Sequence, residues 1–138
     1  MSRSSSQICV ICGVRVAENK DHVPPRNLFP KPRPNDLVTV PACRECNNGS
    51  SVEDEDFRTF LSLQIGKQTE LAKKLWLQSE KSLKRRSAFR QKFLDSLMYV
   101  DVPSGNDLER KMAFGAPERI YQTVFERVVR GLFFHHYG

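Results

Sequence analysis

The four cysteines of the chain form two pairs, Cys9 with Cys12 and Cys43 with Cys46, and two residues separate the members of each pair. A Cys-x-x-Cys pair can place both sulfurs on one metal ion, because the segment between them turns tightly. Two such pairs supply four thiolates in a tetrahedral arrangement, which is the geometry of structural zinc. Two disulfides or a thioredoxin-type redox pair are the alternatives, but nothing in the sequence indicates secretion. The spacing therefore predicts a structural zinc ion.

The segment between the two pairs has its own pattern. It contains Asp21-His22-Val23-Pro24-Pro25, then an irregular stretch rich in proline and basic residues at 26–34. The short β-branched run Leu37-Val38-Thr39-Val40-Pro41 follows, and proline ends it. Asn47 comes directly after the last cysteine. An Asp-His pair, a strand and an asparagine therefore lie within the frame of the cysteine pairs.

This order of motifs resembles the HNH endonuclease superfamily, which has the ββα-metal fold. Over about residues 7–57 it is most similar to the zinc-stapled branch that includes phage recombination endonuclease VII. Asp36, with Asn35 beside it, stands where many relatives have an asparagine before the strand. Asn48-Gly49-Ser50 replaces the Lys-Gly that often follows the last cysteine pair. The resemblance implies a bacterial or phage protein of the cytoplasm.

The resemblance also implies a role for each matching residue. Cys9, Cys12, Cys43 and Cys46 would hold the structural zinc. Asp21 would ligate a catalytic divalent ion through a carboxylate oxygen, and Asn47 would be the second ligand through its amide oxygen. His22 would be the general base that takes a proton from the attacking water.

These residue types suit phosphodiester hydrolysis. Imidazole can accept a proton from water near neutral pH, and a cation can stabilise the charge that develops on the phosphate. One carboxylate and one amide leave most of the coordination sphere to water and phosphate, which suits Mg²⁺ or Mn²⁺. Adjacent residues of a strand point to opposite faces, so Asp21 and His22 can share a site only if the backbone bends. The alternatives are a turn with a surface histidine and, for Asn47, a helix cap.

From residue 53 onward the pattern is mainly helical. Apolar residues recur at helical spacing in 57–65, 71–76, 89–97 and 120–133, which favours buried faces or a surface for a partner subunit. Met98–Pro103 is expected to be a short strand and 104–107 a turn. The acidic residues at 53–56 favour a helix N-terminus, and a metal role for Asp54 or Asp56 is the lesser alternative. The adjacent histidines His135 and His136 make a poor chelating pair, because neighbours on a helix point in different directions.

We therefore expect an α+β protein with two parts. Residues 1–57 would form a small ββα-metal HNH core with a four-cysteine structural zinc. Residues 58–138 would form a mainly helical C-terminal extension that serves in DNA grip, core packing or oligomerisation, as a homodimer or with a partner protein.

Composition narrows the class of protein. The chain of 138 residues has 22 Lys and Arg against 16 Asp and Glu, a net charge of +6 that suits a polyanionic partner. It has no apolar run long enough for a spanning helix and no signal-peptide pattern, so no membrane partner is expected. The candidate phosphate contacts, which are otherwise a solvated surface, are Arg26, Lys31, Arg33, Lys84, Arg85, Arg86 and Arg90.

The leading hypothesis is a metal-dependent endonuclease that uses structural Zn²⁺ and catalytic Mg²⁺ or Mn²⁺. It would hydrolyse phosphodiester bonds of DNA, with RNA as the other candidate substrate. The alternative is a non-catalytic zinc-binding module that binds nucleic acid or a protein partner. The altered position at Asp36 and the missing Lys-Gly favour this alternative.

Overall fold

The structure is a computed structural model that describes residues 7–63 and 69–138. It is a mixed α/β protein with two small antiparallel sheets among the described residues, as the expected α+β class requires at this level. The chain divides into two compact units: residues 1–58 with 119–138, and residues 59–118. Residues 119–138 thus group with the N-terminal segment in the first unit.

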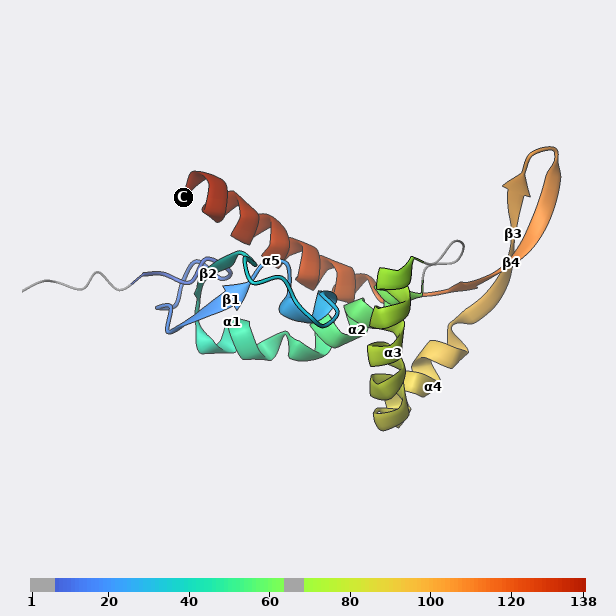
Figure 1. The fold of residues 1–138 in the computed structure, drawn as a ribbon, viewed down its shortest axis with the longest axis horizontal. Coiled ribbons are helices and arrows are strands. Elements are labelled where there is room, and N and C mark those ends of the chain that lie inside the picture. Colours follow the sequence, from blue (N-terminus) through green and yellow to red (C-terminus); the bar gives the residue numbers. More distant parts are fainter. Residues whose placement is uncertain (1–6, 64–68) are drawn as a thin grey trace, which may run out of the picture. The chain divides into compact units, whose positions relative to one another are not determined.

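The first unit contains an antiparallel strand pair followed by helices (Figure 1). Asp21 lies opposite Val40 and His22 lies opposite Thr39 in this pair. The observed second strand begins two residues later than the run expected at 37–41 and includes Ala42. The elements are β1 (Asn19–His22), η1 (Arg26–Leu28), β2 (Thr39–Ala42), α1 (Arg44–Gly49), α2 (Ser51–Ser62) and α5 (Glu118–Tyr137).

Helix α5 buries only part of the wide apolar face that its sequence predicts. The residues that it buries are Ile120, Val124, Arg127 and Gly131, which follow helical spacing. Phe125, Val129 and Phe133 of the predicted apolar face are each more than half exposed. A charged residue and a glycine thus occupy half of the buried stripe, and hydropathy alone does not identify such a stripe.

A close approach explains the glycine. A Cβ atom at Gly131 would lie 2.6 Å from Cγ1 of Val23, the residue that follows β1 and whose side chain is fully buried. At the other end of the contact, the Phe57 ring of α2 meets the rings of Tyr121 and Phe125 edge-on. Helix α5 is therefore packed against both the strand region and α2.

The second unit contains α3 (Glu70–Arg85), α4 (Ser87–Asp95) and a hairpin of β3 (Leu97–Ser104) with β4 (Asp107–Phe114). The Thr69 hydroxyl caps α3 by accepting a hydrogen bond from the backbone N–H of Ala72 at 3.2 Å. Phe60 contacts the rings of Phe89, Phe93 and Phe114, which form the aromatic core of this unit.

The hairpin agrees with the strand expected at 98–103 and the turn expected at 104–107. Gly105 adopts a φ of +64°, a conformation that the turn needs and that glycine adopts without strain. The sequence of strand β4 does not predict a strand, because its first six residues, Asp-Leu-Glu-Arg-Lys-Met, do not alternate between apolar and polar. Most of these residues are exposed. Within the described residues, no helix has the length and apolar character needed to cross a membrane.

Candidate functional site

The four cysteines come together in the first unit. Their sulfur atoms all lie within 4.8 Å of one another, and all four cysteines are free of disulfide bonds. A tetrahedral zinc site with Zn–S bonds of about 2.3 Å needs sulfurs about 3.8 Å apart, so little adjustment is required. Cys9 and Cys12 lie in the turn before β1, Cys43 caps α1 and Cys46 lies within it. The cluster could therefore hold a structural metal ion such as zinc.

Backbone hydrogen bonds shape the first cysteine pair. The N–H of Cys9 donates to the carbonyl of Arg15 at 2.8 Å, and the N–H of Gly13 donates to the carbonyl of Cys9 at 2.8 Å. Gly13 has a φ of +68°, a conformation that this turn needs and that glycine adopts without strain. The tight turn that a metal-binding pair needs is thus built from main-chain contacts.

The electrostatics of the cluster favour a thiolate on one side of it. Hydrogen bonds from the backbone N–H groups of Arg15 and Val14 lower the pKa of Cys12 to about 6. Burial and the neighbouring thiols raise the pKa of Cys46. The Arg15 guanidinium donates to Sγ of Cys43 at 4.0 Å. Thiolates are the form that binds zinc, so these donors support metal binding.

A second site lies in a cavity of about 240 Å³ in the same unit. Asp21 and His22 line it together with Asn47, which lies far from both in the sequence. The remaining lining residues come from the segment after β1 and from the start of α2: Pro25, Arg26, Asn27, Ser51 and Asp54. The structure therefore brings the three expected catalytic residues to one cavity.

The end of β1 explains how adjacent residues reach one cavity. Asp21 is buried and His22 is half-buried, and the strand ends at His22. The chain bends at Val23 and Pro24 and then leads to Pro25 and the short helix η1. The bend that a shared Asp-His site requires is present.

Asn47 reaches the cavity from the helix that carries the second cysteine pair. Its backbone N–H donates to the carbonyl of Cys43 at 3.0 Å, and it lies within α1. The N-terminus of α2 begins only at Ser51, so Asn47 does not occupy the cap position of that helix. A metal bound by the cysteines would stabilise the helix that positions Asn47.

Three buried charged residues of the unit lie in or beside the cavity. Nη2 of Arg127 lies 2.6 Å from Oδ2 of Asp21, and Nη1 of Arg127 lies 2.6 Å from Oδ1 of Asp54. The side chains of Arg127, Asp21 and Asp54 are 5%, 9% and 13% exposed. No sequence motif marks Arg127. Its signal in the sequence is its position three residues after Val124 and four before Gly131, which places it on the same helical face as Ile120 and Val124.

Burial controls the ionisation of this cluster. It raises the pKa of Asp54 to about 6, although the charge of Arg127 opposes the shift. Burial also acts to lower the pKa of Arg127, but the hydrogen bonds and charges of Asp21 and Asp54 outweigh it and raise that pKa. Arg127 therefore stays charged, and Asp54 is ionised above about pH 6.

Asn27 is a further cavity residue that no motif marks in the sequence. It lies in η1, and its Oδ1 atom is buried with no hydrogen-bond donor among the described residues. A buried acceptor without a donor is uncommon and costs about 1–3 kcal/mol. Together with Asp21 and Asn47, Asn27 adds an oxygen suited to a hard cation or to its water ligands.

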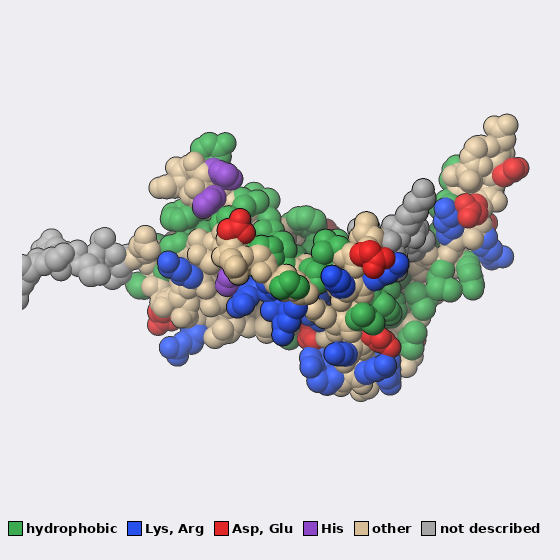
Figure 2. All heavy atoms as spheres, in the orientation of Figure 1, with side chains coloured by type: hydrophobic (Ala, Val, Ile, Leu, Met, Phe, Trp, Pro, Cys, Tyr) green, Lys and Arg blue, Asp and Glu red, His purple; other side chains and the backbone are tan. Residues whose placement is uncertain are grey.

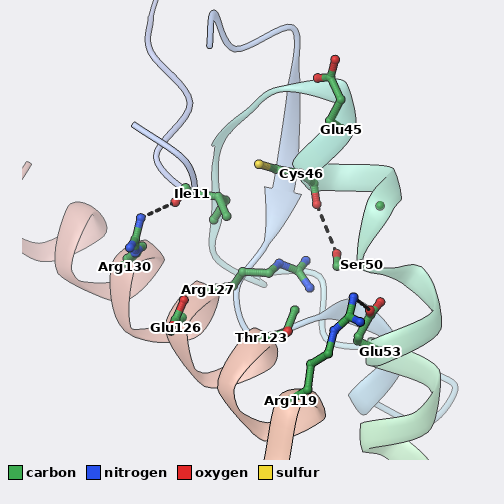
Figure 3. Close-up of a pocket in the computed structure, with 11 residues that line it drawn as sticks. Ile11, Glu45, Cys46, Ser50, Glu53, Arg119, Thr123, Glu126, Arg127 and Arg130 are labelled. Atoms are coloured by element: carbon green, nitrogen blue, oxygen red, sulfur yellow. Dashed lines mark hydrogen bonds and ion pairs between the residues drawn. The ribbon is translucent and has the colours of Figure 1, made fainter. Parts of the chain in front are cut away.

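A second cavity, of about 340 Å³, lies between α5 and the α1–α2 segment (Figure 3). Arg127 lines this cavity and not the cavity of His22. Arg119 pairs with Glu53 at 3.4 Å, and Arg130 donates to the carbonyl of Ile11 at 2.7 Å. These contacts fasten α5 to the cysteine turn and to α2.

The candidate phosphate contacts fall into two groups. In the first unit, Arg26 lines the His22 cavity, Lys31 is exposed, and Nε of Arg33 donates to the carbonyl of Arg26 at 3.1 Å. In the second unit, basic side chains gather over the junction of α3 and α4 (Figure 2). The members of this second group are Lys84, Arg85, Arg86 and Arg90.

Two contacts already use part of the second group. Lys84 pairs with Glu80 at 2.7 Å, and the Arg86 guanidinium lies 4.7 Å from the centre of the Phe89 ring. Asp36 is exposed before β2, and His135 and His136 are exposed at the end of α5. None of these three residues lines the cavity of His22.

Comparisons with protein-family models, with curated proteins and with solved structures give no significant match for this chain. The function is therefore inferred from the residues and their arrangement.

Proposed function

We propose that this protein is a metal-dependent endonuclease of HNH type that hydrolyses phosphodiester bonds, with DNA as substrate. The observation that carries the proposal is the convergence of Asp21, His22 and Asn47 on one cavity. These are the three positions that the resemblance assigns to catalysis. The order of two antiparallel strands and a helix, with a cysteine pair before and after the strands, supports it further.

Each metal has a suitable set of donors. Zinc would be held by the four sulfurs of Cys9, Cys12, Cys43 and Cys46, as a structural ion. Mg²⁺ or Mn²⁺ would be held by the carboxylate of Asp21 and the amide oxygen of Asn47, since both ions prefer oxygen ligands. Asp54 and Asn27 line the same cavity and offer further oxygens.

The mechanism follows from the positions of these side chains. A divalent ion bound in the cavity would offset the negative charge that develops on the phosphate oxygens and on the leaving oxygen. His22, half-buried at the end of β1, would accept the proton of the attacking water. Arg26, at the rim of the same cavity, would contact a phosphate of the bound strand.

The substrate follows from charge. The net charge of +6 and the basic junction of α3 and α4 favour a nucleic-acid backbone over a neutral phosphodiester. The resemblance favours DNA. Neither observation selects a base sequence, because phosphate contacts position a protein without reading bases.

The decisive experiment compares wild type with His22→Ala on supercoiled plasmid and on a branched DNA duplex, with and without Mg²⁺ or Mn²⁺. We expect ion-dependent cleavage by wild type and a loss of at least about 100-fold in His22→Ala, because general-base catalysis contributes about 10²–10⁴-fold. His135→Ala is the matched control, since His135 is exposed at the end of α5. It should cleave like wild type, and all three proteins should contain equal zinc.

Two results would contradict the proposal. Equal cleavage by wild type and His22→Ala would point to a contaminating nuclease. Absence of cleavage, together with no Mn²⁺ binding beyond the zinc, would leave a non-catalytic zinc module whose binding to nucleic acid weakens with salt.

A further inference from the structure

We infer that Arg127 is a positioning residue of the divalent-ion site, which holds the Asp21 carboxylate by one oxygen so that the other oxygen can ligate the ion. This inference rests on the proposed function, because it concerns the same ion. It adds a residue from α5 to a site that the sequence places wholly within the first 57 residues.

One guanidinium contacts two carboxylates with separate nitrogen atoms. Both distances are 2.6 Å, and both carboxylates use one named oxygen each, Oδ2 of Asp21 and Oδ1 of Asp54. Charge-assisted hydrogen bonds of this length are strong, and burial shields them from salt. The planar guanidinium therefore fixes the two carboxylates relative to each other, while one oxygen of each lies outside these bonds.

Arg127 approaches the carboxylates from the side of α5. Asp21 and Asp54 line the His22 cavity, whereas Arg127 lines the other cavity, between α5 and the α1–α2 segment. Figure 3 shows its side chain extending from α5 toward that segment. The carboxylates thus separate Arg127 from the cavity in which substrate would bind. This arrangement assigns Arg127 to orienting Asp21 rather than to touching the phosphate.

Two contacts hold α5 in register with the Asp-His segment. Arg127 meets Asp21, and Gly131, four residues further along the helix, packs against Val23, two residues further along the chain. Four helical residues span about 6 Å and two extended residues span about 6.6 Å, so the two contacts match in spacing. The close approach at Gly131 therefore sets the distance that Arg127 must bridge.

The net charge of the cluster favours binding of a cation. One guanidinium against two ionised carboxylates leaves one net negative charge in a buried position. Arg127 therefore reduces the repulsion between Asp21 and Asp54 without fully neutralising them. A divalent ion bound at the free oxygens would still gain attraction from the pair.

The test separates positioning from charge. Mn²⁺ affinity is measured by calorimetry at pH 8 for wild type, Asp21→Asn, Asp54→Asn and the double variant Arg127→Met/Asp54→Asn. The double variant has one more negative charge near the site than Asp54→Asn, so charge alone predicts tighter Mn²⁺ binding. Positioning predicts the opposite. We expect the double variant to bind Mn²⁺ at least about tenfold more weakly than Asp54→Asn, as loss of a residue that orients a metal ligand typically does.

Two controls accompany this comparison. Arg130→Met removes an arginine of the same helix that contacts the Ile11 carbonyl, and it should leave Mn²⁺ affinity unchanged. Arg127→Lys keeps the charge but cannot bridge two carboxylates, and we expect it to bind Mn²⁺ severalfold more weakly than wild type. If the double variant fails to fold, Arg127→Lys carries the test, with zinc content and thermal melting as checks of folding.

The outcomes are distinct. Equal or tighter Mn²⁺ binding by the double variant than by Asp54→Asn, or unchanged binding by Arg127→Lys, overturns the role of Arg127 alone. If wild type has no Mn²⁺ site that Asp21→Asn removes, the proposed function fails and the role of Arg127 falls with it.

Discussion

The cysteine cluster and the Arg127 ion-pair cluster, both in the first unit, are assembled in different ways. The cysteines come as two short pairs, and main-chain hydrogen bonds shape the turn of the first pair. The ion-pair cluster joins Arg127 to Asp54 across 73 positions of sequence and to Asp21 across 106 positions. The first set of ligands needs little beyond its local spacing, whereas the second exists only when α5 is packed in place.

This difference shows where each cluster is vulnerable. The cysteine cluster depends on four identical groups and on a metal ion that they would share. The ion-pair cluster depends on one arginine, and it is buried together with two carboxylates. Removing one partner of such a cluster leaves uncompensated charge in the interior. Three substitutions test these dependences and are given in order of decreasing effect.

The largest effect is expected at the cysteine cluster. Cys43→Ser removes a buried ligand and should abolish zinc binding, because three thiolates and a hydroxyl hold zinc poorly. Structural zinc contributes on the order of 10 kcal/mol to the folding of small domains, so most of the helical signal of the first unit should be lost. Zinc analysis by mass spectrometry and circular dichroism measure the two effects.

Val14→Ser is the control for this prediction. Val14 lies in the same turn as Cys12 and is 79% exposed. The control should retain zinc and secondary structure. Full folding of Cys43→Ser without zinc would show that the cluster is not a structural metal site. The cysteine cluster would then no longer differ from the ion-pair cluster by its dependence on a metal ion.

The next largest effect is expected at the ion-pair cluster. Arg127→Met should lower the free energy of unfolding by about 3–5 kcal/mol, because Asp21 and Asp54 would remain buried without a counter-charge. Urea denaturation at pH 8 measures this loss. Arg130→Met, on the same helix and at the surface, should cost less than about 1 kcal/mol. Similar losses for the two variants would mean that the buried cluster contributes no more to the free energy of unfolding than a surface contact does.

The smallest effect is expected at the helix contact that positions Arg127. Gly131→Ala would place a Cβ atom 2.6 Å from the buried Val23 side chain. Overpacking costs about 1–3 kcal/mol, and the better helix propensity of alanine offsets up to about 1 kcal/mol. We therefore expect a net loss of about 1–2 kcal/mol in the free energy of unfolding, with a lower melting temperature.

Gly49→Ala provides the matched comparison. Gly49 is the last residue of α1, and a Cβ atom there would meet nothing within 4 Å. This variant should be neutral or slightly stabilising. A Gly131→Ala protein as stable as Gly49→Ala would show that α5 has room to move, and it would weaken the argument that the helix sets the position of Arg127.

The sequence predicts some elements of the fold better than others. The helical character of 53–62, the strand at 98–103 and its turn all follow from local patterns, and the structure confirms them, whereas Ile65, at the end of the stripe expected at 57–65, lies outside the described residues. The wide apolar face expected on α5 is buried only in part, because Ile120 and Val124 are buried but Phe125, Val129 and Phe133 are exposed. Periodicity indicates which residues share a face, but it does not indicate which of two faces packs inward.

The two Cys-x-x-Cys motifs can be recognised in the amino-acid sequence, because each pair is local and its ligands are chemically unambiguous. Residue types and their order also mark Asp21, His22 and Asn47. Tertiary packing is needed to bring these three residues to one cavity and to join Arg127 to Asp21 and Asp54. A buried ion pair between distant segments has no local signature, since its free energy depends on burial that packing alone creates.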